Sequence, residues 1–448
     1  MRKSPAALPV YRGPFGRPQA ERLLWRAGFG PRKGEAEALA RLGLDGAVQA
    51  LTRPGPERLV GPPPRDRRGN PLAPTDASGH DHAWWLDRMV RTSRPLVERM
   101  TLVWHDWFAT SNVGVGSQRF MLAQNGLLRR HALGSFESLL LELTRDPAML
   151  VWLSGNRSEE TAPNENYARE LMELFTLGAG KGYTERDVRE QARALTGWRS
   201  DFRQGVGWVD FRYDPARHDA GFKRVFGRRG RFDWKDACRL CLEHPAHPEF
   251  LVRKLWSYFV PEPPAGDTRR GLERLYRAGG RRIRPLLEAI LRHPALHDGP
   301  RMTKPPVVVT AGLLRTLGTG VRTEAWAERD ALSGQRLFYP PSVAGWDEEA
   351  WLDTATFRGR WNGVAAALAP RISRPGASEP VQAPALVRRA RAFLGDPTLT
   401  SATTGALTRF AARALADADT PARRRARTAS VENALRLLIA ASPDFQTC

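Results

Sequence analysis

Hydrophobic side chains recur at helical spacing along most of the chain. In residues 95–109, for example, Val97, Met100, Trp104 and Phe108 return to one face of a helix. Glycine and proline interrupt the pattern and divide it into segments. We expect helices over residues 19–27, 33–52, 82–93, 95–109, 118–133, 136–145, 164–177, 184–196, 234–243, 248–260, 267–278, 283–292, 305–317, 384–394, 406–418 and 421–441. The predicted fold class is mainly α, a multi-helix array with irregular Pro/Gly/Trp-rich loops.

Some segments depart from helical spacing. Residues 208–213 alternate between apolar and polar side chains, so the irregular insert at 198–232 is expected to hold at most a short β-hairpin. Residues 53–79 are rich in Pro, Gly and Arg and predict a long, mobile loop that folding does not need. The expected organisation is an irregular segment at 1–18, a main helical domain at 19–370, and a linker with a C-terminal helical tail packed on that domain at 371–448.

Composition adds a strong positive charge to this picture. The 448 residues carry a formal net charge of +21, which suggests nucleic acid or an anionic membrane as a partner. However, only seven of the 69 basic residues are lysines, and the arginines are spread along the chain. Such a skew is typical of a GC-rich genome. Arginine-driven binding of nucleic acid is therefore kept as an alternative but is not favoured.

The cysteines and the N-terminus exclude several classes of protein. Three cysteines cannot form a disulfide framework. Cys238 and Cys241 predict two semi-buried thiols rather than a zinc site completed by His244 and His247, and Cys448 is expected to be exposed. The N-terminal residues lack the apolar core of a signal peptide, and no run of about 18 apolar residues could span a membrane. We expect a cytoplasmic protein, with export alongside a partner left open.

Residues 163–175 form the most informative segment, because two side-chain stripes share one predicted helix. The apolar stripe consists of Tyr167, Leu171, Leu174 and Phe175. The polar stripe beside it consists of Asn166, Glu170 and Glu173, and Glu165 and Arg169 occupy a third edge. A solvated acidic face is one interpretation. The other, which the surrounding sequence favours, is that the carboxylates face a cleft.

The polar residues of this helix suit two kinds of chemistry. Glu170 and Glu173 are three residues apart, and with imidazoles from His105 and His218 they could hold a divalent metal such as Mn, Fe or Zn. Without a metal, the carboxylates could act as an acid/base pair while Arg169 keeps one ionised or clamps an anionic group. The simpler alternative for Arg169 is an ion pair with Glu165, four residues before it.

Single residues elsewhere are open to two interpretations each. His105 lies beside a buried stripe and is either a metal ligand or general base, or a structural histidine. His218 lies in an irregular segment, where functional groups are common. Trp346 belongs to a Trp/Pro-rich run at 338–351 that either offers a platform for sugar or peptide or, as we prefer, plugs the helical array next to the cleft.

Several motifs together resemble one family. They are the run Asn164-Glu165-Asn166-Tyr167-Ala168-Arg169-Glu170, and also Trp104-His105-Asp106-Trp107, Gln124-Asn125, Arg129-Arg130-His131, His218-Asp219 and Ala344-Gly345-Trp346. Over residues 20–363 the chain resembles the bacterial family called domain of unknown function 1800. The resemblance implies a largely helical protein, often encoded beside a sulfatase-like or phosphatase-like partner. It implies no established reaction.

These observations lead to one leading hypothesis and two alternatives. The leading hypothesis is an enzyme with a polar, metal-binding or acid/base cleft for an anionic or saccharide-like substrate. Its catalytic residues would be His105, Glu165, Arg169 and Glu170; its substrate-binding residues Asn125, Asn166 and Trp346; and its metal ligands Glu170, Glu173, His105 and His218. We expect His105 and Glu170 to line one cavity with Glu165, Glu173 or His218. The alternatives are a non-catalytic helical scaffold for a sulfatase-like or phosphatase-like partner and the nucleic-acid binder.

Overall fold

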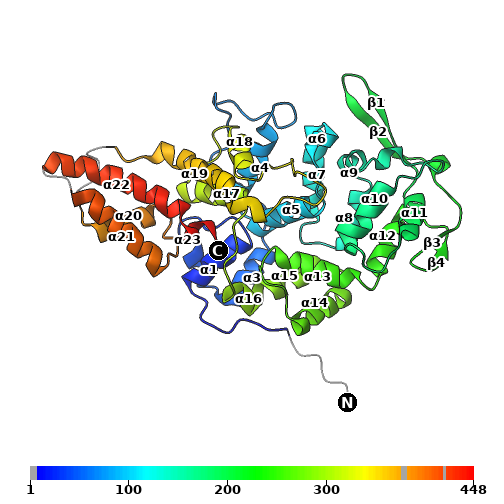
Figure 1. Cartoon of the computed structure of the whole chain (residues 1–448), viewed down its shortest axis with the longest axis horizontal. Coiled ribbons are helices and arrows are strands. Elements are labelled where there is room, and N and C mark those ends of the chain that lie inside the picture. The colour runs from blue at the N-terminus through cyan, green and yellow to red at the C-terminus, as the bar shows by residue number, and fades with distance from the viewer. Residues whose placement is uncertain (1–7, 375–380, 417–419) are drawn as a thin grey trace, which may run out of the picture.

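The computed structural model describes residues 8–374, 381–416 and 420–448, and the fold is mainly α, as predicted (Figure 1). Parts of the expected N-terminal segment (1–7), linker (375–380) and tail (417–419) lie outside the described residues. No helix in the described ranges is long and apolar enough to cross a membrane.

The first half of the chain contains α1 (Arg17–Arg26), α2 (Glu35–Ala40), α3 (Gly43–Thr52), α4 (His80–Arg91), α5 (Pro95–Trp107), α6 (Asn112–Val115), α7 (Gln118–Arg130), α8 (Phe136–Thr144), α9 (Pro147–Trp152), α10 (Glu165–Glu170), the π-helix η2 (Leu171–Thr176) and α11 (Glu185–Ala194). The second half contains α12 (Trp234–Glu243), α13 (His247–Ser257), α14 (Gly266–Ala278), α15 (Ile283–Arg292), α16 (Pro294–His297), α17 (Pro306–Leu317), α18 (Trp326–Leu332), α19 (Thr354–Leu368), α20 (Ala383–Phe393), α21 (Ser401–Ala416), α22 (Pro421–Ala441) and α23 (Pro443–Gln446). Short 3-10 turns join some of them.

The irregular insert holds two antiparallel hairpins where one at most was expected. One pairs β1 (Trp198–Arg203) with β2 (Gly207–Tyr213), and the other pairs β3 (Lys223–Val225) with β4 (Arg228–Gly230). Both lie at the edge of the molecule: β1 and β2 project past α9 and α10, and β3 and β4 lie beyond α11 and α12 (Figure 1). The second hairpin was missed because each of its strands has only three residues, too few to show an alternating pattern.

The buried hydrophobic residues form two clusters, and α5 contributes to both. The first cluster joins α5 to α1, α3, α7, α8, η2 and α12–α15 through side chains such as Trp104 and Trp107. The second joins α4, α17, α19, α20 and α22, and takes Leu102 from α5. Because α5 is packed from both sides, the polar residues along it lie deep in the molecule.

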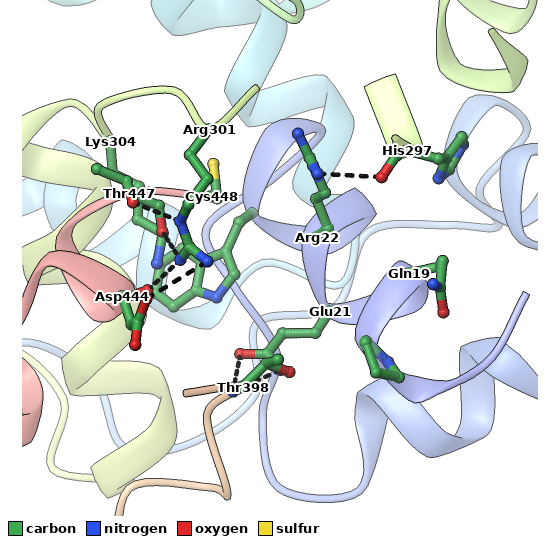
Figure 2. Close-up of a pocket in the computed structure, with 12 residues that line it drawn as sticks. Gln19, Glu21, Arg22, His297, Arg301, Lys304, Thr398, Asp444, Thr447 and Cys448 are labelled. Atoms are coloured by element: carbon green, nitrogen blue, oxygen red, sulfur yellow. Dashed lines mark hydrogen bonds and ion pairs between the residues drawn. The ribbon is translucent and has the colours of Figure 1, made fainter. Parts of the chain in front are cut away.

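The C-terminal end of the chain lies against α1 and the segment before α17. Figure 2 shows this junction around a cavity of about 160 Å³. Arg301 donates to the carbonyl of Asp444 at 2.6 Å, and Lys304 donates to that of Phe445 at 2.6 Å. Arg26 donates to the carbonyl of Cys448 at 2.7 Å. Cys448 is consequently buried, so the expectation that it is exposed was wrong.

The Pro/Gly/Arg-rich loop at 53–79 is tied to its neighbours by backbone hydrogen bonds. Val60 N–H donates to the carbonyl of Arg91 at 2.8 Å, and Arg65 N–H donates to that of Val321 at 3.0 Å. Arg67 also pairs with Glu324 at 2.9 Å. These contacts give the loop a defined path, while its mobility and dispensability stay predictions.

Candidate functional site

The helix α5 carries polar residues on two neighbouring faces. Pro95 begins it at a position where no N–H is needed. Arg99 and Asp106 are seven residues apart, two turns along one face, and both line a narrow cleft with Leu102 and Val103 between them. Glu98 and His105 are likewise seven apart on the adjacent face. The helix thus positions two polar clusters, which we call the Asp106 cleft and the Glu98 network.

Asp106 is the centre of the Asp106 cleft. Its carboxylate accepts a hydrogen bond from the Tyr258 hydroxyl at 2.6 Å and another from the backbone N–H of Trp346 at 2.9 Å. Gly345 makes this approach possible, because a Cβ there would stand 2.3 Å from Asp106 Oδ1 and its φ is +96°. Burial nevertheless raises the pKa of Asp106.

Lys254, which lies on α13, is close enough to Asp106 to interact with its charge. Its ammonium donates to the carbonyl of Leu174, in the π-helix, at 3.1 Å and lies 4.8 Å from the centre of the Trp107 ring. Burial lowers the pKa of Lys254 to about 8, and the nearby charge of Asp106 opposes this shift. Lys254 is therefore a cationic group that can lose its proton close to neutral pH.

Two further charged groups complete the Asp106 cleft. Glu348 is exposed to solvent, but partial desolvation by the surrounding protein raises its pKa to about 7, and repulsion from Asp106 adds to the effect. Arg99 is 4% exposed, and its Nε and Nη1 atoms are buried without a hydrogen-bond partner. Raised carboxyl pKa values beside a buried, uncommitted guanidinium are typical of functional sites.

Lys254 also lines a larger cavity. It measures about 610 Å³, within the usual size of ligand pockets. We call it the Lys254 cavity; it is lined by Leu177, Gly178, Lys181, Ala246, Glu249, Phe250, Arg253 and Lys254. Leu177 and Gly178 directly follow the π-helix, so part of the cavity wall comes from residues next to the informative segment 163–175.

His105 is enclosed by aromatic rings. The centres of Trp85, Trp346 and Phe338 lie 5.2, 5.4 and 5.7 Å from that of the imidazole. Its Nε2 atom has no hydrogen-bond partner, and burial lowers its pKa to about 3. His105 is therefore a neutral, buried ring. Trp346 is also buried and packs against the His105 ring, and its role in substrate binding stays a prediction.

The Glu98 network connects His105 with Asn125. Trp85, which touches His105, donates through Nε1 to Glu98 at 3.2 Å. Arg129 forms a two-pronged ion pair with Glu98, with Nη2 at 3.0 Å, and also donates to Asn125 Oδ1 at 2.6 Å. His105 and Asn125 thus belong to one neighbourhood, although neither lines the Lys254 cavity.

The acidic helix does not continue as an α-helix. It is α-helical through Glu170 and then widens into the π-helix η2, a rare form that is frequent at functional sites. Arg169 forms a bidentate pair with Glu185 at 2.7 Å and lies 3.5 Å from Glu165, near the surface. Lys254 donates to the carbonyl of Leu174 within this π-helix.

Among the predicted ligands, Glu170 is half-buried, and its pKa is raised first by burial and then by Glu173. The Nδ1 atom of His218 forms hydrogen bonds with the hydroxyl and the carbonyl of Thr196, near the two hairpins. Asn166 is exposed, and its backbone N–H donates to the side chain of Asn164, the N-cap of α10.

No group of three or more His, Cys, Asp or Glu side chains in the described ranges could hold a metal. The four expected metal ligands, Glu170, Glu173, His105 and His218, are therefore not gathered into one site. That all the predicted catalytic residues act in one cleft stays a prediction.

Lys254, Tyr258 and Glu348 were not predicted as site residues. A signal for two of them was present, because Leu251, Lys254, Leu255 and Tyr258 share the apolar stripe of one helix. A lysine at a core-facing position is unusual unless its charge has a partner. Glu348 carried no such signal, since it follows an irregular run.

Comparison with known proteins gives a family and no more. No curated protein and no solved structure matches the chain. A family described as "Protein of unknown function (DUF1800)" matches residues 22–447, nearly the whole chain. The motifs that surround the Asp106 cleft and the π-helix all lie within this match, and the chain belongs to the DUF1800 family.

Proposed function

We propose that the protein is an enzyme that binds an anionic substrate in the Lys254 cavity and uses Lys254 as its proton-transfer group. The observation that carries this proposal is the position of Lys254, which lines a cavity of about 610 Å³ and interacts with Asp106 behind it. A general acid or base is most effective when its pKa lies near the working pH. A pKa of about 8 meets that condition.

The lining of the Lys254 cavity supports an anionic substrate. Lys181, Arg253 and Lys254 contribute three positive charges, and Glu249 is the only acidic residue among the lining residues. Glu249 already pairs with Arg253 at 2.9 Å and with Arg269 at 3.0 Å. The ring of Phe250 supplies an apolar wall for the uncharged part of the substrate.

Asp106 and Tyr258 act as positioning residues for Lys254. Tyr258 is one helical turn after Lys254, and its hydroxyl holds the Asp106 carboxylate. The carboxylate in turn favours the protonated form of Lys254, against the effect of burial. Removing Asp106 should therefore lower the pKa of Lys254 further.

The titration of Lys254 can be measured directly. Acylation of the protein with acetic anhydride at a series of pH values, followed by peptide mass spectrometry, gives the pH of half-maximal reaction for each lysine. Lys254 is expected to react with a midpoint near pH 8, well below that of Nα-acetyllysine amide added as the reference. A midpoint equal to that of the reference would remove the basis of the proposal.

A second experiment separates an enzyme from a scaffold. Small carboxylates, phosphate esters and sulfate esters are screened for thermal stabilisation, and the ligands that bind are tested for turnover. Lys254→Arg keeps the charge but cannot titrate, so it should retain binding and lose turnover. Lys254→Met should lose turnover and the binding of every ligand that wild type turns over, while Lys235→Met, a matched change at an exposed lysine, should lose neither. If wild type and Lys254→Arg turn over a substrate equally, Lys254 is not the proton-transfer group.

A further inference from the structure

A second basic cavity lies apart from the Lys254 cavity, between α3, α5, α7 and α15. It measures about 450 Å³, and we call it the arginine pocket. Its lining residues are Arg53, Pro54, Glu57, Arg94, Val97, Gly126, Arg129, Arg130, Ala132, Leu133, Gly134 and Arg284. Five of these are arginines and only one is acidic. We propose that the arginine pocket binds the phosphate group of an organic phosphate monoester.

The single acidic residue does not neutralise the pocket. Glu57 is engaged by Arg88, whose Nη2 lies 2.8 and 2.7 Å from its two oxygens. Among the five arginines, Arg53 has an acidic partner, Glu288, at 3.1 Å. Arg129 is held by the buried Glu98. These pairs leave an excess of positive charge on the wall of the cavity.

Three of the arginines have no partner at all in the part of the chain that the structure describes. Arg94, Arg130 and Arg284 form no side-chain hydrogen bond and no ion pair there, and the Nε atom of Arg94 is buried without a partner. The buried Nε of Arg94 is unusual, because buried donors are normally satisfied, whereas the guanidinium groups of Arg130 and Arg284 are exposed to solvent. Three uncommitted guanidinium groups around one cavity match a ligand that accepts several N–H donors at once.

The guanidinium of Arg129 is already held in place before any ligand binds. Arg129 is oriented by Glu98, which is 0% exposed, and by Asn125, 2.6 Å away. Arg129 also lies 5.7 Å from the centre of the Trp84 ring. A rigid guanidinium loses little conformational freedom when a ligand binds, whereas the long side chains of Arg130 and Arg284 can adjust to it.

The backbone adds to the preference for an anion. Arg94 is the N-cap of α5, Arg284 is the second residue of α15, and neither helix has a side-chain cap. The partial positive charge of a helix N-terminus favours negative groups. A phosphate monoester carries close to two negative charges near neutral pH and three terminal oxygens, which suits several donors better than one carboxylate does. Val97, Ala132 and Leu133 leave an apolar wall for its organic part.

The test is calorimetric titration with glucose 6-phosphate, inorganic phosphate and glucose 6-sulfate. The double variant Arg130→Ala/Arg284→Ala removes two exposed side chains without protein partners, so its melting temperature should not change. Arg274→Ala/Arg358→Ala is the matched control, since it removes two exposed charges outside the pocket. We expect saturable binding of both phosphate probes, weaker binding of the sulfate, and a loss of at least about tenfold in phosphate affinity in the pocket variant only.

Four results would overturn the proposal. The first is the absence of saturable phosphate binding by the wild type. The second is equal affinity in the pocket variant and the control variant. The third is preferential binding of a single-stranded oligonucleotide that both double variants weaken equally, since this would indicate general surface charge. Binding that persists in Lys254→Met would place the phosphate outside the Lys254 cavity, as the proposal requires, whereas loss of binding in that variant would contradict it.

Discussion

Replacing Glu98 by glutamine should destabilise the protein strongly, although the two side chains have the same shape. The Glu98 side chain is 0% exposed and accepts hydrogen bonds from Trp85, Arg88 and Arg129. The side chains of Arg88 and Arg129 are only 16% and 15% exposed. Glutamine would remove the negative charge and turn an N–H₂ group toward guanidinium donors. Arg129 would then have no acidic partner, and Arg88 would keep only Glu57.

The magnitude follows from this geometry. Removing one partner of a buried ion pair costs about 3–5 kcal/mol, whereas an exposed pair contributes about 0–1 kcal/mol. For a chain of this size unfolding as a unit, the entropy of unfolding converts about 4 kcal/mol into a fall of roughly 4 °C in melting temperature. Glu142→Gln is the matched control, because Glu142 pairs with Arg145 at the surface, where the two side chains are 36% and 51% exposed.

Thermal unfolding followed by circular dichroism, together with urea unfolding, measures both variants. We expect Glu98→Gln to shift the urea midpoint downward at unchanged slope and Glu142→Gln to leave it unchanged. If Glu98→Gln lowers the free energy of unfolding by less than about 1 kcal/mol, the Glu98 carboxylate does not hold Arg129 in place. The pre-oriented guanidinium in the arginine pocket would then lose its structural basis.

Gly345→Ala should lower the melting temperature and disturb the Asp106 cleft, because the new Cβ would lie 2.3 Å from Asp106 Oδ1 at a φ of +96°; an unchanged melting temperature would contradict this. The pKa of buried Lys304 is lowered to about 8 from its ordinary 10.5, so the unfolded state holds more protons between these values and stability rises with pH. The free energy of unfolding of the wild type should therefore rise by about 3 kcal/mol relative to that of Lys304→Met between pH 8 and 10.5, as measured by urea unfolding. If the difference between the two proteins does not change with pH, burial does not lower the pKa of Lys304. The pKa of His105 is lowered to about 3, so the unfolded state takes up its proton first and stability falls as the pH drops from 6.5 toward 3. His105→Phe should flatten that acid dependence, and a variant that keeps the full wild-type slope would show that other groups cause it.

Helix positions were predictable wherever the hydrophobic period was strong. The segments around α5, α13 and α17 were expected within a few residues of their observed bounds, because the i to i+4 repeat is a local property of the chain. The helix α19 (Thr354–Leu368) was missed, since Gly359 and Gly363 weaken its pattern. Its cap was a usable signal, because Asp353 accepts from the N–H of Thr356 at 2.8 Å.

The change from α-helix to π-helix at Leu171 was not predictable from spacing. The stripe of Tyr167, Leu171, Leu174 and Phe175 fits an ordinary helix in sequence. The wider turn instead coincides with contacts from elsewhere, such as the Trp107 indole, which donates to the carbonyl of Phe175 at 3.1 Å. The energy that selects between two helical forms comes from such packing, which no local pattern contains.

The sequence by itself determined that the chain is a mainly helical member of its family and where most of its longer helices lie. Only the tertiary structure decided which polar groups meet. Asp106 is joined to Tyr258 across 152 residues and to Trp346 across 240, and the arginine pocket draws on three separate helices and on the loop after α3. The physical reason is that helical periodicity specifies which face of a segment is buried, whereas the partner of that face is chosen by long-range packing, and the pKa values of Lys254 and Glu348 depend on that partner.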